Sequence, residues 1–168
     1  MEYTQQNAVV LEKYTDSDFE SYYSLVSDDQ VMAYITGHGL TLEEAREHYS
    51  SILQVNAAHP ELGFFKIYNT GGTYIGEGKL EWCKDSPTQL EVGYILKKNY
   101  WGKGYGTMIC SRLLTLADTL FPATDVIGII DPFNVSSKRI LEKFGFESYF
   151  VGIEAGLPTE KLVRRNRM

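Results

Sequence analysis

A glycine-rich segment between a predicted strand and a predicted helix constrains the fold of this chain more than any other feature. The segment reads WGKGYGT at 101–107, after the apolar run LEVGYIL at 90–96 and before a helix predicted over about 106–120. Its glycines stand at alternate positions, Gly102, Gly104 and Gly106. The first turn of a helix leaves N–H groups unpaired and carries partial positive charge, and glycines let an anion approach those groups closely. The pattern therefore predicts a phosphate-binding loop.

The spacing of the glycines excludes two common nucleotide motifs. The loop reads G-x-G-x-G where the dinucleotide fingerprint requires G-x-G-x-x-G, and the chain has no G-x-x-x-x-G-K-S/T of a triphosphate P-loop. A plain strand-to-helix turn is the alternative, although three alternating glycines exceed what a turn needs. Lys103 would add a positive charge beside a bound phosphate.

Hydrophobic periodicity in the first third of the chain predicts a strand followed by two helices. The strand covers 9–14. The first helix is predicted to begin with a capping box of Ser17 and Glu20, and the second with a capping box of Thr41 and Glu44.

The remainder of the chain alternates between strands and helices. Residues 63–82 predict a hairpin around the turn NTGG, and 125–130 predicts a strand covered on both faces. Asn134 is predicted to cap the next helix, and strands at 146–152 and 161–165 would complete the sheet. This order of elements predicts a mixed α/β or α+β fold.

Composition narrows the function classes. The chain has 168 residues, which suits a single domain over 1–168, and its net charge of −6 disfavours nucleic acid as the main partner. No apolar stretch approaches the ~20 residues of a membrane span, and the first residues lack the pattern of an export signal. Cys83 and Cys110, like the three histidines, lack metal-ligand spacing, so we expect no metal and a cytoplasmic location.

The loop and its surroundings resemble the GNAT N-acetyltransferase superfamily. W-G-K-G-Y-G-T is similar to the Q/R-x-x-G-x-G/A pyrophosphate loop of that superfamily, with Trp101 where most members have Gln or Arg. EVGYILKKNYWGKGYGT, SDDQVMAYI, TLEEAREHY and DPFNVSSKRILEKFGF resemble its ribosomal-protein N-acetyltransferase (RimJ/RimL-like) branch. The resemblance covers roughly residues 8–150.

This resemblance implies a GNAT-like fold that binds acetyl-CoA as co-substrate. The expected fold is a single mixed, mostly antiparallel sheet flanked by helices, in which the parallel strands 90–96 and 125–130 splay apart around the pantetheine arm. Residues expected to contact the cofactor are Tyr94, Ile95, Leu96, Trp101, Gly102, Lys103, Gly104, Tyr105, Gly106, Thr107 and Asn134. A helix cap is an equally good reading of Asn134, and solvent-exposed helix charge is the favoured reading of Lys138 and Arg139 over contact with CoA phosphate.

The resemblance also implies two catalytic roles. Glu91, at the head of the splayed strand, matches the glutamate that serves as general base in some GNAT enzymes; Glu77 and Glu81 are the next candidates, and a solvated strand carboxylate is the alternative for each. Many GNAT enzymes place an acidic tyrosine seven residues after the asparagine, where this chain has Leu141. Either Ser137 or a water protonates the leaving thiolate, or the thiolate leaves without help. A first-turn helix residue that satisfies a backbone group is an equally good interpretation of Ser137.

The function expected from the resemblance is acetyl-CoA-dependent acetyl transfer to a primary amine, with a protein or peptide N-terminal α-amine as one acceptor class. The alternatives are a CoA-binding regulatory domain without turnover and an acetyltransferase of small amines such as polyamines or antibiotics. The segment YITGHGLT at 34–41 would cover the acceptor, or else form a plain surface loop. We expect no nucleic acid or membrane partner, and either a monomer or a homodimer.

Overall fold

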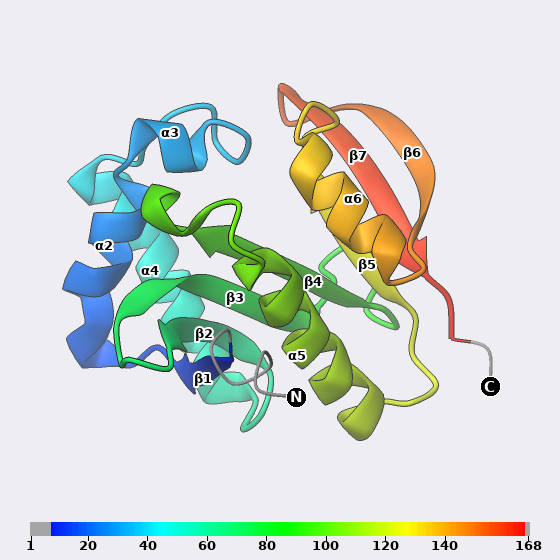
Figure 1. The fold of residues 1–168 in the computed structure, drawn as a ribbon, viewed down its shortest axis with the longest axis horizontal. Coiled ribbons are helices and arrows are strands. Elements are labelled where there is room, and N and C mark those ends of the chain that lie inside the picture. The colour runs from blue at the N-terminus through cyan, green and yellow to red at the C-terminus, as the bar shows by residue number, and fades with distance from the viewer. Residues whose placement is uncertain (1–7, 167–168) are drawn as a thin grey trace.

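The computed structural model describes residues 8–166, in which one seven-stranded sheet carries helices on both faces (Figure 1). Its strands are β1 (Val9–Lys13), β2 (Gly63–Asn69), β3 (Tyr74–Trp82), β4 (Leu90–Leu96), β5 (Val126–Ile130), β6 (Glu147–Glu154) and β7 (Leu157–Arg164). Its helices are η1 (Asp16–Asp18), α2 (Phe19–Val26), α3 (Asp29–Met32), α4 (Leu42–Ala58), η2 (Lys98–Tyr100), α5 (Tyr105–Leu120) and α6 (Val135–Lys143).

The strand order is β1-β2-β3-β4-β5-β7-β6, and β4–β5 is the parallel pair. These two strands pair only at three positions, from Leu90↔Val126 to Val92↔Gly128, whereas β3 follows β4 as far as Gly76↔Leu96. Within residues 8–166, positions 93–96 thus have no ladder partner on the β5 side. The predicted splayed, mostly antiparallel sheet is confirmed.

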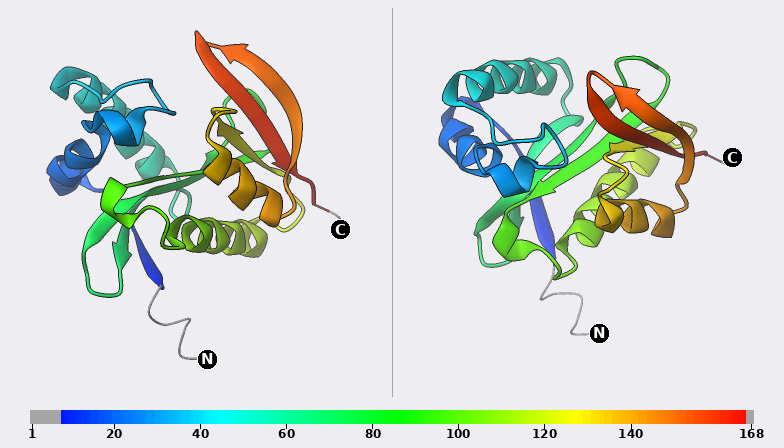
Figure 2. Two further views of the ribbon diagram at one scale, coloured as in Figure 1. Left: turned by 45° about the horizontal axis from the view of Figure 1, so that its top comes forward. Right: turned by 90° about the horizontal axis from the view of Figure 1, so that it is seen from above.

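Two apolar cores lie on opposite faces of the sheet. On one face α5 packs its buried stripe, including Ile109 and Leu113, against the central strands. Gly78 allows this close approach, because a Cβ there would lie 3.2 Å from the Ile109 Cγ2 atom. On the other face lie α2, α3 and α4 (Figure 2). Their side chains form a second core that includes Tyr22 and Tyr49.

Helix capping shows where local prediction held. The Thr41–Glu44 capping box is confirmed, as is Asn134 at the N-cap of α6. The Ser17–Glu20 box is wrong: Thr15 and Asp18 form the capping box instead. Asp18 accepts the Thr15 backbone N–H at 2.8 Å and also pairs with Lys66 of β2, a tertiary contact that local sequence does not reveal.

A short helix, a helix end and the two cysteines can also be compared with the sequence. The four-residue helix α3, whose first turn is capped by Asp28, was not predicted. Gly145 ends α6 with a φ of +89°, as expected for a left-handed cap. Cys83 and Cys110 are free, buried thiols. Among residues 8–166 we find no helix with the length and apolar character needed to cross a membrane.

Candidate active site

The glycine loop forms the N-terminal end of α5. Gly104 is the N-cap residue, with a φ of +87° and no side chain to cap the helix, and Gly102 has a φ of +70°. A Cβ built at either glycine meets no atom within 4 Å, so open space lies in front of both. Gly106 has a different role, because a Cβ there would lie 3.0 Å from the Ile140 Cδ1 atom and 3.1 Å from the Tyr94 ring.

A cavity of about 590 Å³, the glycine-loop cavity, adjoins this helix end. Ten of the predicted cofactor residues line it: Tyr94, Ile95, Leu96, Trp101, Gly102, Gly104, Tyr105, Gly106, Thr107 and Asn134. Lys103 lies outside that lining, with its ammonium 5.8 Å from the centroid of the Tyr100 ring. Of the lining residues within 8–166, Arg139 is the single charged one. Backbone N–H groups, a helix N-terminus and one cation together suit an anionic ligand.

Two of the predicted cofactor residues also have structural contacts. The Trp101 indole Nε1 donates to the Leu96 carbonyl at 2.9 Å, which ties the loop to the end of β4. The Asn134 Oδ1 accepts the Ser137 backbone N–H at 3.2 Å, as a helix cap does. Asn134 therefore caps α6 and also lines the glycine-loop cavity.

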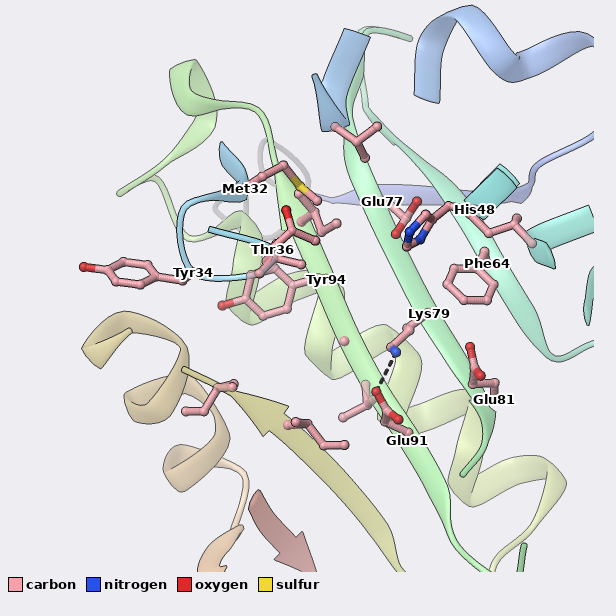
Figure 3. A pocket seen from close by; sticks show the side chains of 18 of the residues that line it. Met32, Tyr34, Thr36, His48, Phe64, Glu77, Lys79, Glu81, Glu91 and Tyr94 are labelled. Carbon is pink, nitrogen blue, oxygen red and sulfur yellow. Dashed lines mark ion pairs between the residues drawn. The ribbon is translucent and has the colours of Figure 1, made fainter. Parts of the chain in front are cut away.

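A second cavity of about 580 Å³, the acidic cavity, lies on the face of the sheet covered by α2, α3 and α4 (Figure 3). Besides tyrosines and Cys110, its titratable lining comprises five carboxylates, two lysines and one histidine: Glu47, Glu77, Glu81, Glu91, Asp131, Lys79, Lys84 and His48. Strand alternation places Glu77, Lys79 and Glu81 of β3 on one face, and Glu91 lies directly opposite Glu81. This register brings the predicted base and both of its runners-up into one cavity.

The central carboxylates differ in their partners. The Lys79 ammonium lies 2.5 Å from the Glu91 carboxylate, whereas Glu77 Oε1 and Glu81 Oε2 are buried with no hydrogen-bond partner among the described residues. Burial raises the pKa of Glu77 to about 7, and Lys79 only partly offsets this. Burial also raises the pKa of Glu81. For Lys79 burial lowers the pKa, but the nearby carboxylates, Glu91 first, outweigh it and the pKa is raised.

A hydroxyl pair lies on the other side of β4. The Tyr94 hydroxyl reaches from the strand to α6, where it lies 3.2 Å from the Ser137 Oγ. Burial raises the pKa of Tyr94, and Ser137 opposes that shift. Leu141, at the position of the family tyrosine, is buried against Gly128 and belongs to the core.

The two cavities adjoin one another where β4 and β5 part. Six residues line both: Tyr34, Ile35, Tyr94, Ile95, Asn134 and Ser137. Tyr34 and Ile35 come from the segment predicted to cover an acceptor, and that segment does border the acidic cavity. A molecule in the glycine-loop cavity and a second one in the acidic cavity would thus meet beside Tyr94 and Ser137.

Sequence reasoning missed Lys79 and the hydroxyl of Tyr94. The alternation E-x-K-x-E at 77–81 places a lysine on the same strand face as two glutamates, which is a readable signal for an ion pair. The contact between Tyr94 and Ser137 has no such signal, because it depends on how α6 packs against β4.

Comparison with known proteins agrees with this geometry. A family model described as the GNAT acetyltransferase domain matches residues 8–147. The chain is 23% identical to the uncharacterized N-acetyltransferase YoaA of Bacillus subtilis over 147 residues. This alignment covers 85% of this chain and 81% of YoaA.

Solved structures share the fold. A GnaT-family acetyltransferase from Bordetella pertussis aligns with a TM-score of 0.79 and 20% identity, over 96% of this chain and 98% of that one. A spermidine N-acetyltransferase from Vibrio cholerae, solved in complex with CoA and spermine, aligns with a TM-score of 0.77 and 15% identity, over 97% of each chain. On the family match and the shared fold, this chain belongs to the GNAT family of acetyltransferases.

Proposed function

We propose that this chain, as a single domain, transfers the acetyl group of acetyl-CoA to a primary amine. The observation that carries the proposal is the meeting of two cavities of opposite character at the split between β4 and β5. One suits a phosphorylated cofactor and the other a cationic amine. Acetyl-CoA, when bound, supplies an acetyl group activated as a thioester.

The glycine-loop cavity fits CoA. The N–H groups of Gly102 to Thr107 would hold the pyrophosphate, in front of two glycines whose Cβ positions are open. Arg139, which lines the cavity, would contact a phosphate. Along the edge of Tyr94, Ile95 and Leu96 that β5 leaves unpaired, the Tyr94 N–H and C=O and the Leu96 N–H would bond the pantetheine amides, because the Ile95 groups face β3. Trp101, bonded to the Leu96 carbonyl, supports the strand end, and Lys103 adds positive charge nearby.

Glu91 is the proposed general base. An amine attacks only when uncharged, and at pH 7 deprotonation costs roughly 4 to 5 kcal/mol for a lysine-type amine but about 1 kcal/mol for an α-amine. The carboxylate of Glu91 would accept that proton in the acidic cavity. Since Lys79 holds this carboxylate at 2.5 Å, the approach of a cationic amine would compete with Lys79 for it.

Ser137 is the proposed proton donor to the departing sulfur, and Tyr94 supports it. The two hydroxyls lie 3.2 Å apart in the region shared by both cavities. The Tyr94 hydroxyl would return a proton to Ser137 and would itself be reprotonated from water in the cavity, so the proton given to sulfur is supplied by solvent through the pair. The pair would thus do the work of the tyrosine that many family members have at the position of Leu141.

The acceptor class and the branch of the family stay predictions. The motifs resemble the ribosomal-protein branch, which points to an N-terminal α-amine, whereas the Vibrio cholerae relative is a spermidine N-acetyltransferase and brings small polyamines into consideration. The alternative of a CoA-binding domain without turnover has no support in the comparisons.

The test is release of free CoA thiol from acetyl-CoA in the presence of a panel of amines. The panel contains an alanyl peptide, a triamine such as spermidine and an aminoglycoside, with a buffer-only background. We expect thiol release above background with at least one amine and a product that is heavier by one acetyl group. If CoA fails to bind at millimolar concentration, the proposed function is wrong.

A further inference from the structure

We propose that the acceptor is a small molecule with at least two ammonium groups, held by the Glu77 and Glu81 carboxylates in the acidic cavity. This inference rests on the function proposed above, because it names the substrate of that site. It departs from the N-terminal α-amine that the sequence motifs favour.

The charge balance of the cavity is the first argument. Five carboxylates face it against two lysines, and Lys79, the lysine at the centre, is engaged by Glu91. Lys84, the other lysine, and Glu47, one of the carboxylates, are both exposed, which leaves four carboxylates around one engaged lysine in the interior of the cavity. The cavity therefore carries a surplus of negative charge that a ligand of several positive charges would neutralise.

The second argument comes from the two unpartnered oxygens. Glu77 is 6% exposed and Glu81 is 8% exposed, yet Glu77 Oε1 and Glu81 Oε2 accept no hydrogen bond from residues 8–166. Burial of a carboxylate oxygen without a donor is costly, so such an oxygen takes a donor from ordered water or from a ligand that enters the cavity. An ammonium group supplies three donors and the opposite charge.

The spacing of these carboxylates indicates more than one ammonium group. Glu77 and Glu81 are four residues apart on β3, which places their Cα atoms roughly 13 Å apart. Figure 3 shows Lys79 between them, extending toward Glu91. They are thus separate contact points, and two amino groups on one molecule would serve both.

The walls of the cavity suit a flexible carbon chain rather than a polypeptide. The apolar side chains along it include Ile52 and Val55 of α4 and the Phe64 ring of β2. The segment with Ile35 and Thr36 closes another side. Methylene spacers between amino groups would pack on these walls, whereas a peptide backbone would bring N–H and C=O groups that need partners of their own.

The experiment is titration calorimetry on the full chain saturated with CoA, which binds without turnover. The probes are the triamine spermidine, the monoamine butylamine and an alanyl peptide with one α-amine. We expect spermidine to bind at least about tenfold more tightly than either single-amine probe, since each paired charge adds affinity. Equal affinity for spermidine and butylamine would overturn the proposal, even if CoA binds and the peptide is acetylated.

Isosteric variants test the named residues. Glu81→Gln and Glu77→Gln should each weaken spermidine binding by about tenfold or more, while butylamine binding and CoA affinity change by less than about twofold. The matched control is Glu154→Gln. Glu154 lies on β6, outside both cavities, and its carboxylate pairs with Lys161 of β7. Unchanged spermidine affinity in both test variants would contradict the proposal, and intact CoA binding would show that the variants are folded.

Proton release gives a second readout. A cation beside Glu77 favours its ionised form, so spermidine binding near pH 7 should release protons, seen as a dependence of the heat on the buffer. Along β3 the charged groups near Glu77 are Lys79 and Glu81. The tyrosines coupled to Glu77 are Tyr14, which hydrogen-bonds it, Tyr22 of α2, Tyr49 of α4 and Tyr74 of β3. His48 of α4 lines the same cavity and faces it from the opposite wall (Figure 3). The release should vanish in Glu77→Gln; its persistence there would assign it to another group.

Discussion

The two cavities that meet at the split sheet are built from different parts of the chain. The glycine-loop cavity presents backbone N–H groups at a helix end, with positive-φ glycines that leave space in front of them. The acidic cavity presents side chains from β3 and β4, with charges that are only partly balanced. The ligand contacts of a site made of backbone groups depend less on which side chains surround them, whereas those of a site made of side chains change directly when a side chain is replaced. We infer that this division lets one fold keep its cofactor while its acceptor varies.

The largest expected effect comes from filling the backbone site. Gly104→Val should weaken CoA binding by about 1000-fold, because it blocks several charge-assisted bonds to phosphate. The matched control is Gly156→Val in the β6–β7 turn, where φ is +77° against +87° at Gly104 and a Cβ likewise meets open space. Calorimetry should show intact CoA binding in the control; equal losses in both variants would attribute the effect to backbone strain.

The free energy of unfolding should depend on pH through Glu77 in the acidic cavity. Glu77 has a raised pKa, so the folded chain holds a proton that the unfolded chain has released, and stability falls as pH rises from about 4.5 to 7. Glu77→Gln removes this loss. Its stability relative to the native chain should rise by about 3 kcal/mol between pH 4 and pH 8, as measured by urea unfolding.

The pKa of Glu160 is shifted in the opposite direction, so its contribution to the free energy of unfolding should change with pH in the opposite direction. Glu160 is buried and paired with Lys138 at 3.0 Å; burial opposes ionisation, but Ser148 and Lys138 outweigh it and its pKa is lowered. Glu160→Gln should therefore lose stability relative to the native chain above about pH 4.5, and the loss should shrink in acid. Parallel pH trends in the two variants would refute the contrast between a paired and an unpartnered carboxylate.

Replacement of the proposed base should affect turnover without affecting CoA binding. Glu91→Gln should lower turnover by about 100-fold while CoA affinity stays nearly unchanged, because the carboxylate belongs to the acidic cavity alone. The loss should grow below pH 7, where more of the amine is protonated. Steady-state rates for this variant and for Glu154→Gln form the comparison; unchanged turnover in Glu91→Gln would move the base to another residue.

The smallest expected effect lies at the junction of the cavities. Ser137→Ala should lower turnover by about tenfold, the value of one hydrogen bond to sulfur in the transition state. If Tyr94 acts through Ser137, adding Tyr94→Phe should cost little further. Independent, multiplying losses in the double variant would show that the two hydroxyls do not act as a pair.

Much of the fold and of the proposed cofactor site could be predicted from local sequence. The strand at 90–96, the glycines of 101–107 and the Asn134 cap depend on backbone conformation and neighbouring residues, and periodicity and capping rules read such features directly. Ser17 failed as a cap because the neighbouring Asp18 bonds Thr15 and pairs with Lys66, a residue 48 positions further along the chain.

The sequence by itself determined that a strand, a glycine-rich loop and a helix follow one another, since these elements are set by the conformational preferences of nearby residues. Only the tertiary structure decided that Glu91 pairs with Lys79 and that Tyr94 reaches Ser137. It also decided that Glu77 and Glu81 are buried, each with one oxygen that no group in the described part of the chain bonds. Those outcomes depend on strand register, on what covers each face of the sheet and on the packing of α6. Such long-range contacts set the burial and the charge of each group, and with them the chemistry of the acidic cavity.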